Sequence, residues 1–447
     1  MDDFKEINRF WYLQRIALPL FFESILQVLV LNINQYMISS YSETGVAAIG
    51  NANQVFSLLQ STFSFMGAAT VIMISQYRGA GKTRKEHNVY TLALLINGGV
   101  SLLLSLFLLL MNRPLFILLD VPSEVMAEAQ AYMAIVGGTM FIQALFLTFS
   151  AFLRSNALMR FGLIISIVSN IVNVVLNYLL IFGNLGFPEL GTVGAAIATA
   201  GSRLVGLVLI IIVFVRYVRV SISLKQLSPF PFAQLKRLLQ VGMPTIVESL
   251  SINITRIITM AFINGFGIAA INTRIYATML ANFSFMYTGA LANASQVVLG
   301  RFLGAKLTKE TNDKCMSIFR IGLIANISIA IVMYLCSDFL FSIFTDSPET
   351  LALGKTIMLL DIILEIGRVS NIVFIRSLQT AGDIMVPAGI AVVVSWTCSV
   401  GVGYLFGVVL GWGLIGVWIA LTLDECIRGA ANLIRWKQGK WKKQDLV

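Results

Sequence analysis

Two acidic residues, Glu248 and Glu365, lie inside long apolar segments, each at the same distance from a basic residue near one end. Glu248 follows Arg237 by eleven residues and Glu365 precedes Arg376 by eleven, about 16 Å along a helix. A carboxylate near the middle of a bilayer costs about 2.5–3.5 kcal/mol to insert, so such residues usually have a role. The pair predicts a binding position for a proton or a sodium ion.

Further charged residues stand near these acids. Asp361 and Arg368 share the helix face of Glu365, at i−4 and i+3, and Arg256 and Arg274 fall in neighbouring apolar segments. Asp361 is a third candidate for ion coupling, and the three arginines would tune the charge of the site. Two interpretations stay open for Glu365: an ion-coupling role, or a structural ion pair with Arg368 or Arg256. Likewise, two interpretations stay open for Arg256 and Arg274: either the carboxylates neutralise them, or a compound bound beside them is anionic.

The first and fifth apolar segments carry a second, mostly uncharged polar set. Its members are Glu23, Gln27 and Asn34 on one helix face, and Ser166, Asn170, Asn173 and Asn177 on another. Amides do not titrate at physiological pH, so the asparagines can bind substrate or water, or join neighbouring helices, but cannot carry a proton. Glu23 is either a second ion site or a polar helix contact.

The chain repeats itself. Pro-x-x-x-Glu-Ser occurs at Pro19 and again at Pro244, 225 residues later in a chain of 447. The pattern Gly-x-x-Gly likewise occurs at Gly191 and at Gly413. The predicted organisation is an N-terminal bundle at 1–220, a cytoplasmic linker at 221–237, and a C-terminal bundle with a basic tail at 238–447. Parallel repeats of this kind, with buried polar sites, are typical of alternating-access transporters.

Composition predicts an all-α integral membrane protein, because 57% of the residues are hydrophobic and 12% are charged. Twelve apolar segments are long enough to span a bilayer, six in each half. Of the 32 lysine and arginine residues, 24 fall in loops on the side of the termini and two on the other side. This asymmetry predicts a multi-pass protein of the cell membrane with both termini in the cytoplasm.

Several classes of function are disfavoured. The four cysteines have no metal-binding spacing, and His87, the single histidine, lies in a basic loop. No nucleophile–base pair or metal cluster accompanies a span, so we expect no enzyme activity, no catalytic residue, no metal and no cofactor beyond a coupling ion, H⁺ or Na⁺. The basic residues are scattered over short loops, so we expect no nucleic-acid partner. The expected partners are the bilayer and a small organic substrate, for a monomeric chain.

The sequence resembles the multidrug and toxic compound extrusion (MATE) family over essentially its whole length. The resemblance rests on the first-span proline, the basic loop after the second span, the Arg154-Ser155 end of the fourth span, Asn177-Tyr-Leu-Leu-Ile-Phe-Gly and Gly191-Thr-Val-Gly-Ala-Ala-Ile-Ala-Thr. It implies twelve transmembrane helices in two pseudo-symmetric six-helix bundles forming a V. The implied activity is export of organic or drug-like compounds in exchange for H⁺ or Na⁺.

The resemblance also implies where the functional positions lie. Glu365 matches a cation-binding acid of the family's tenth span, whereas Glu248 lies one turn before the family's usual seventh-span glutamate. Asn34 and Asn177 replace aspartates that many members use for proton coupling, so the C-terminal half is the expected coupling half. The expected cavity residues are aromatic or soft apolar side chains: Phe56, Phe63, Met66, Tyr276, Met279, Phe283 and Met286. A flippase for lipid-linked precursors, from the same superfamily, is the alternative.

Overall fold

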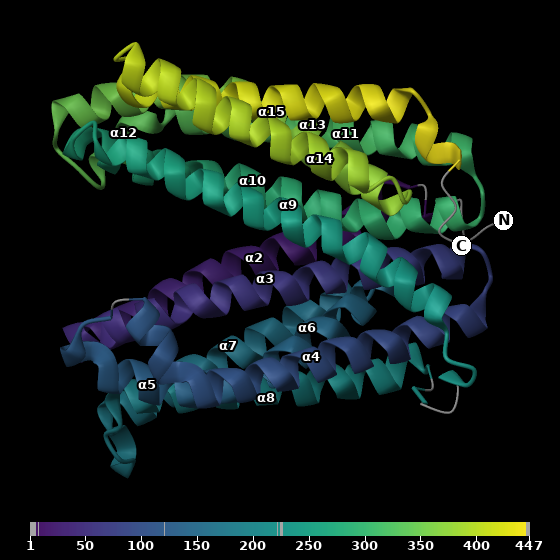
Figure 1. Cartoon of the computed structure of the whole chain (residues 1–447), viewed down its shortest axis with the longest axis horizontal. Helices are drawn as coiled ribbons and strands as arrows, with labels where there is room; N and C mark the ends of the chain where they lie inside the picture. Colours follow the sequence, from purple (N-terminus) through teal and green to yellow (C-terminus); the bar gives the residue numbers. More distant parts are fainter. Residues whose placement is uncertain (1–5, 8, 120, 221, 224–226, 444–447) are drawn as a thin grey trace. The chain divides into compact units, whose positions relative to one another are not determined.

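The computed structural model describes residues 6–7, 9–119, 121–220, 222–223 and 227–443, and all regular secondary structure in these ranges is helical (Figure 1). Parts of the predicted linker (221 and 224–226) and of the basic tail (444–447) lie outside the described residues. The long helices are α2 (Phe10–Ser39), α3 (Glu43–Gly79), α4 (Thr83–Leu118), α5 (Ser123–Gly138), α6 (Met140–Ser155), α7 (Met159–Phe182), α8 (Gly191–Val213), α9 (Phe232–Asn264), α10 (Ile268–Gly304), α11 (Thr308–Leu335), α13 (Pro348–Thr380), α14 (Met385–Val394) and α15 (Gly413–Lys437).

Shorter elements extend or join these helices. The π-helical segment η2 (Phe214–Val218) continues α8, and η4 (Ser395–Val402) and η5 (Leu405–Val409) continue α14 to the end of its span. The remaining short elements are η1 (Asn184–Gly186), α12 (Ser337–Ser342) and η6 (Lys440–Lys443).

The described helices account for the predicted spans. Eight of them are long and apolar enough to cross a membrane, and α5 with α6, bent by 42° at Thr139, make a ninth. The three other long helices, α10, α13 and α15, have 37, 33 and 25 residues, so they also have the length to span a bilayer. They match the eighth, tenth and twelfth predicted spans; α13 and α15 carry charged residues in their middle turns, and α10 carries Arg274 two turns after its start.

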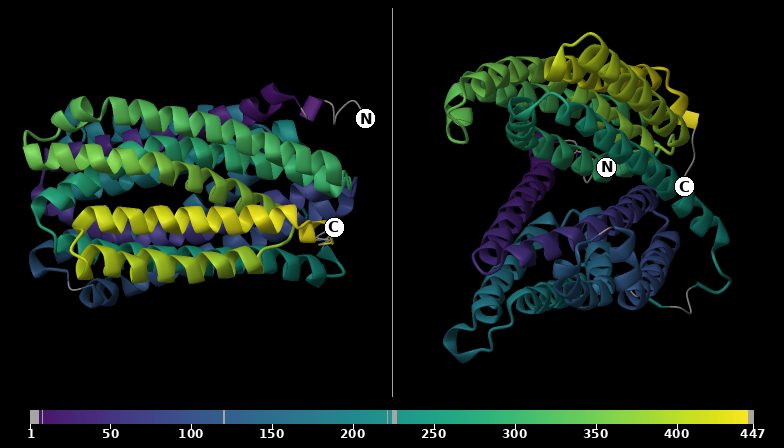
Figure 2. Two further views of the ribbon diagram at one scale, coloured as in Figure 1. Left: turned by 90° about the horizontal axis from the view of Figure 1, so that it is seen from above. Right: turned by 60° about the vertical axis from the view of Figure 1, so that its left-hand side comes forward.

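The helices form two compact units. Unit 1 comprises Met1–Phe21, Arg78–Gly81 and Gln240–Val447, and unit 2 comprises Phe22–Tyr77 and Lys82–Leu239. The first turns of α2 belong to unit 1, where Tyr12 accepts a hydrogen bond of 2.9 Å from Arg301 on α10. Within unit 1, α13 packs against α15, α10 and α11, as Figure 2 also shows. The helices that carry the most charge are therefore covered by neighbouring helices.

The repeated glycine pattern has the same structural role in both units. A Cβ atom on Gly194 at the start of α8 would lie 2.3 Å from the backbone oxygen of Leu180 in α7. A Cβ atom on Gly416 at the start of α15 would lie 2.7 Å from the backbone oxygen of Phe406 in η5. In each unit the last helix can approach the preceding span only because this position has no side chain.

Candidate functional site

Carboxylates occupy the middle of three helices of unit 1. Glu248 is the central residue of the 33-residue α9, and Glu425 is the central residue of the 25-residue α15. Glu365 lies one residue past the centre of the 33-residue α13. Each helix therefore places an acidic side chain about as far from its two ends as its length allows.

Glu365 is held by a cation and an amide. The side chain is fully buried, its Oε1 forms an ion pair with Arg368, and its Oε2 accepts a hydrogen bond of 2.9 Å from Asn326 on α11. Asn326 is itself fully buried and its Oδ1 has no hydrogen-bond partner among the described residues. The structure thus contains the ion pair with Arg368 that the sequence suggested, together with an amide contact from another helix.

Asp361 lies one turn before Glu365 and is 1% exposed. Its charge interacts with those of Arg368 and Arg274, and among the described residues its Oδ1 accepts no hydrogen bond. The guanidinium of Arg274 stands over the ring of Trp418 on α15, 5.0 Å from the ring centre, in a cation–π contact. Two carboxylates and one closely paired arginine therefore share the centre of α13, with a second arginine nearby.

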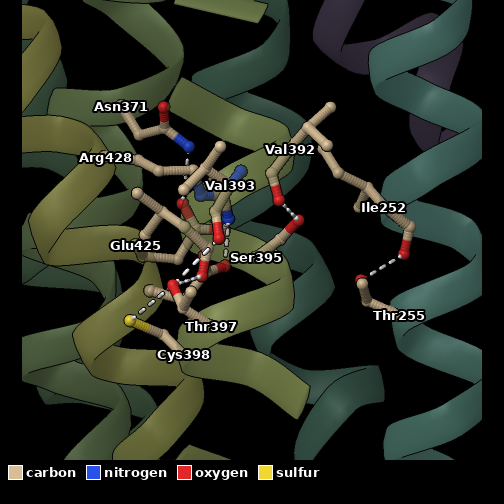
Figure 3. Close-up of polar contacts among 12 residues, drawn as sticks. Ile252, Thr255, Asn371, Val392, Val393, Ser395, Thr397, Cys398, Glu425 and Arg428 are labelled. Atoms are coloured by element: carbon tan, nitrogen blue, oxygen red, sulfur yellow. Dashed lines mark hydrogen bonds and ion pairs between the residues drawn. The ribbon is translucent and has the colours of Figure 1, made fainter. Parts of the chain in front are cut away.

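The last helix brings a second charged group into the same unit. Arg428 pairs with Asp424, and its Nη2 lies 3.2 Å from Oε1 of Glu425. Asn371 on α13 donates a hydrogen bond of 2.8 Å to Oε2 of Glu425 and accepts one of 3.1 Å from Asn432. Figure 3 shows Glu425 and Arg428 together with Asn371. The residues of this group come from the adjacent helices α13 and α15.

Two glycines allow these helices to approach closely. A Cβ atom on Gly367 would lie 2.7 Å from the backbone nitrogen of Cys426, and one on Gly429 would lie 2.8 Å from the backbone oxygen of Gly367. Both distances are shorter than real Cβ contacts. Gly367 is next to Arg368 in the chain and Gly429 is next to Arg428. The close packing of the two helices therefore brings the charged residues of α13 near those of α15.

Glu248 has different neighbours from Glu365. Its charge interacts with those of Arg376 and Arg428, and its Oε2 has no hydrogen-bond partner among the described residues. Glu365 instead interacts with the charges of Arg368, Asp361 and Glu425 and with the amide of Asn326. The two acids singled out by the sequence are therefore linked through charged residues of α15 rather than by mutual contact.

Arg256 lies two turns beyond Glu248 on α9 and is exposed on the surface of unit 1. Its strongest attractive interaction is with Glu425, followed by Asp424. The charge-tuning role proposed for Arg256 would thus act first on the acids of α15.

The mostly uncharged polar set of unit 2 is joined by hydrogen bonds. Ser166 donates to Glu23 over 3.0 Å. Asn177 donates to Asn34 over 2.9 Å and to Asn173 over 3.4 Å. These contacts join α2 to α7, and Gln27 is exposed one turn beyond Glu23. The asparagines therefore do serve as contacts between helices.

The expected cavity residues fall into two groups. Phe56 and Phe63 belong to the hydrophobic core of unit 2, and Tyr276 stacks on Phe344, with a ring separation of 5.0 Å, against the core of unit 1. Met66 is also buried, and Met286 is partly buried. Met279 and Phe283 on α10 are 47% and 45% exposed, so these two present apolar surface outside the core.

Sequence reasoning missed the charged residues of the last helix. Asp424 precedes Arg435 by eleven residues, the spacing that identified Glu365 before Arg376. Counting eleven residues back from the basic residue at the end of the twelfth span would have identified Asp424. Nothing in the sequence distinguishes Asn326 or Asn371 from other asparagines, because their role depends on which helices become neighbours.

Comparison with known proteins places this chain in a transporter family. The MatE family profile matches residues 19–179 and 244–405, which are the two repeats. An uncharacterised transporter of Bacillus subtilis, YisQ, is 32% identical over 443 residues, covering 99% of this chain and 97% of that protein. A probable multidrug resistance protein of Thermotoga maritima, NorM, is 25% identical and covers 97% of this chain and 93% of its own.

Solved structures share the fold. The Vibrio cholerae MATE transporter VcmN in its bent form superposes with a TM-score of 0.88 at 20% identity, over 100% of this chain and 99% of that one. A MOP superfamily transporter from Pyrococcus furiosus gives a TM-score of 0.86 at 20% identity, covering 97% and 96% of the two chains. With two apolar repeats, the buried charges in the second and a family match across both, this chain belongs to the MATE family of membrane transporters.

Proposed function

We propose that this protein exports organic compounds across the cell membrane in exchange for H⁺ or Na⁺, by alternating access, with both termini in the cytoplasm. The observation that carries the proposal is Glu365: a fully buried carboxylate at the centre of a spanning helix, paired with Arg368 and bonded to Asn326. Intramembrane acids with such partners mark ion pathways in transporters.

The charges of α13 suggest how an ion would act. Glu365 and Asp361 are both buried, and among the described residues Arg368 forms a close ion pair with Glu365 and none is formed with Asp361. Uptake of one cation would neutralise the remaining carboxylate and reduce the cost of keeping the pair away from water. If the ion binds one conformation more tightly than the other, its gradient drives the change between them.

Substrate contact would involve α10. The exposed side chains of Met279 and Phe283 offer polarisable and aromatic surface that adapts to ligands of different shape. The relative from Thermotoga maritima is described as a probable multidrug resistance protein, which is consistent with a broad substrate range.

The test is transport in proteoliposomes under an imposed pH gradient and then under an imposed sodium gradient. Glu365→Gln keeps the size of the side chain and removes its charge, so we expect gradient-driven efflux to stop while the protein still folds. The matched control is Asp338→Asn, which removes an acid from an exposed ion pair with Lys355 and should leave efflux unchanged. Wild-type coupled efflux by Glu365→Gln would refute the proposal.

A flippase for lipid-linked precursors is a second candidate function. Arg256, an exposed residue within the spanning helix α9, favours it, because an anionic headgroup would pair with its charge. Accumulation of a lipid-linked sugar in a deletion strain, reversed by the wild-type gene but not by an Arg256→Gln variant, would support the flippase over the exporter.

A further inference from the structure

The eleventh span changes its helix type in the middle of the membrane. It is α-helical through Val394, and Ser395–Val402 and Leu405–Val409 are then π-helical. In a π-helix the backbone bonds run to the fifth residue instead of the fourth, and such segments frequently accompany functional sites. Here the segment turns two hydroxyl side chains inward, Ser395 at 1% and Ser399 at 3% exposure.

Asp424 on α15 faces this segment. It is 4% exposed, and one of its oxygens pairs with Arg428. The other, Oδ1, is buried and makes no hydrogen bond with any described residue, and the hydroxyl that interacts with the carboxylate is that of Ser399. A buried carboxylate oxygen without a partner is costly, by more than the roughly 1–3 kcal/mol of a neutral group.

The charged groups around Asp424 do not fully compensate the free-energy cost of burying its unpaired oxygen. On α15, Arg428 is shared with a second acid, Glu425, so two carboxylates pair with one guanidinium. The charged and titratable groups facing Asp424, directly or through Arg428, are Glu425 and Arg428 on α15, Arg256 and Glu248 on α9, Cys398 on η4 and Arg368 on α13. Arg256, the other cation near Asp424, interacts more strongly with Glu425 than with Asp424.

We propose that Asp424 and Ser399 form a second binding position for the coupling cation, H⁺ or Na⁺, separate from Glu365 and completed by the π-helical segment. The proposal rests on the exchange function proposed above. Its ligands are a carboxylate oxygen and a hydroxyl, and intramembrane acids of this kind mark ion pathways and proton relays in transporters. We call this position the α15 site.

The position of Arg428 gives the α15 site a consequence for the rest of unit 1. Arg428 pairs with Asp424 and Glu425 and also interacts with the charge of Glu248 on α9. A cation on Asp424 weakens the Asp424–Arg428 pair, and the guanidinium then binds its other two carboxylates more strongly. Ion uptake on α15 is thereby transmitted to α9, the helix that also carries Arg256.

The first measurement is the number of cations bound by the purified full-length protein. Sodium binding is followed by titration calorimetry at fixed pH, and proton uptake by a pH-sensitive dye in sodium-free buffer. We expect two cations of one kind per wild-type chain. Glu365→Gln should abolish one and Asp424→Asn the other. The matched control is Asp383→Asn, which removes a buried acid paired with Arg435 near the end of α13 and should leave both.

Variants of Ser399 test the site without touching an ion pair. Ser399→Ala should weaken the second cation about tenfold and leave the first unchanged, whereas Ser399→Thr, which restores a hydroxyl, should recover most of the affinity. A single cation in the wild type, or two cations remaining in Asp424→Asn, would overturn the α15 site.

The two proposals fail in different ways. Loss of one cation in Asp424→Asn, with coupled efflux persisting in Glu365→Gln, would refute the role of Glu365 and support the α15 site. If Asp424→Asn still bound two cations and Glu365→Gln had lost coupled efflux, the exchange function would stand and the α15 site would be refuted.

Discussion

Replacing Gly429 with alanine should separate α13 from α15. The added Cβ would lie 2.8 Å from the backbone oxygen of Gly367 and from the Cβ of Ser370, where ordinary contact begins at 3.4 Å. The helices must therefore move apart locally by about 0.6 Å. Overpacking of this kind costs about 1–3 kcal/mol. The same movement would stretch the 2.8 Å bond from Asn371 to Glu425 beyond the usual range for such bonds.

The assay compares two glycine-to-alanine variants in unit 1. Gly289 on α10 has nothing within 4 Å of its added Cβ, so Gly289→Ala gains helix propensity without a clash. Both variants gain the same helix propensity, so the difference between their unfolding midpoints reports only the steric clash at residue 429. We expect the unfolding midpoint of Gly429→Ala in detergent to lie about 2–12 °C below that of Gly289→Ala, since each kcal/mol shifts it by about 2–4 °C. Equal midpoints would refute the close packing of α13 and α15.

Three further predictions concern individual polar contacts. Asn326→Ala should weaken binding of the coupling ion about tenfold or more, because a hydrogen bond to the charged Glu365 contributes about 1.5–3 kcal/mol. Unchanged affinity in an ion titration would show that the Asn326–Glu365 hydrogen bond is not part of the ion site. Arg368→Met should lower stability by about 3–5 kcal/mol by leaving a buried carboxylate unpaired, and the double variant with Glu365→Gln should recover most of the loss in a denaturant titration. Asn34→Ala and Asn177→Ala should retain gradient-coupled efflux at a lower rate, and uncoupled efflux in either would assign ion coupling to unit 2 instead.

The fold was predictable because hydrophobic length and repeated sequence act locally. The twelve predicted spans correspond to helices, including the bent α5–α6 pair, since each needs only enough apolar residues to cross a bilayer. The second glycine of each repeated pattern was also meaningful: Gly194 and Gly416 both meet the backbone of the preceding span. The π-helical stretch after Val394 was not predictable, because the sequence there reads as an ordinary apolar helix.

The charged site was predictable only in part. Depth in the membrane follows from counting along one helix, and this identified Glu248 and Glu365. Which charges become neighbours depends on packing between helices, and the sequence did not show that Arg428 would stand between acids of α9 and α15. Arg256 illustrates the same limit, since its interactions are with the acids of α15 rather than with Glu365.

Three helices of unit 1 differ in composition from the other spans of the chain and carry charged residues. Within the described chain, α10, α13 and α15 are the long unbroken helices that are either less apolar or more highly charged than the other spans. Their charged residues include Arg274, Asp361, Glu365, Arg368, Asp424, Glu425 and Arg428. Such helices are stable in a membrane only when other helices cover their charged faces, and these three pack against one another. In unit 2 the equivalent positions carry mainly amides and hydroxyls, which can hold helices together but cannot exchange a proton. The two repeats thus share a scaffold but differ in chemistry, and the buried carboxylates of unit 1 are the reason for assigning the proposed ion coupling to that unit.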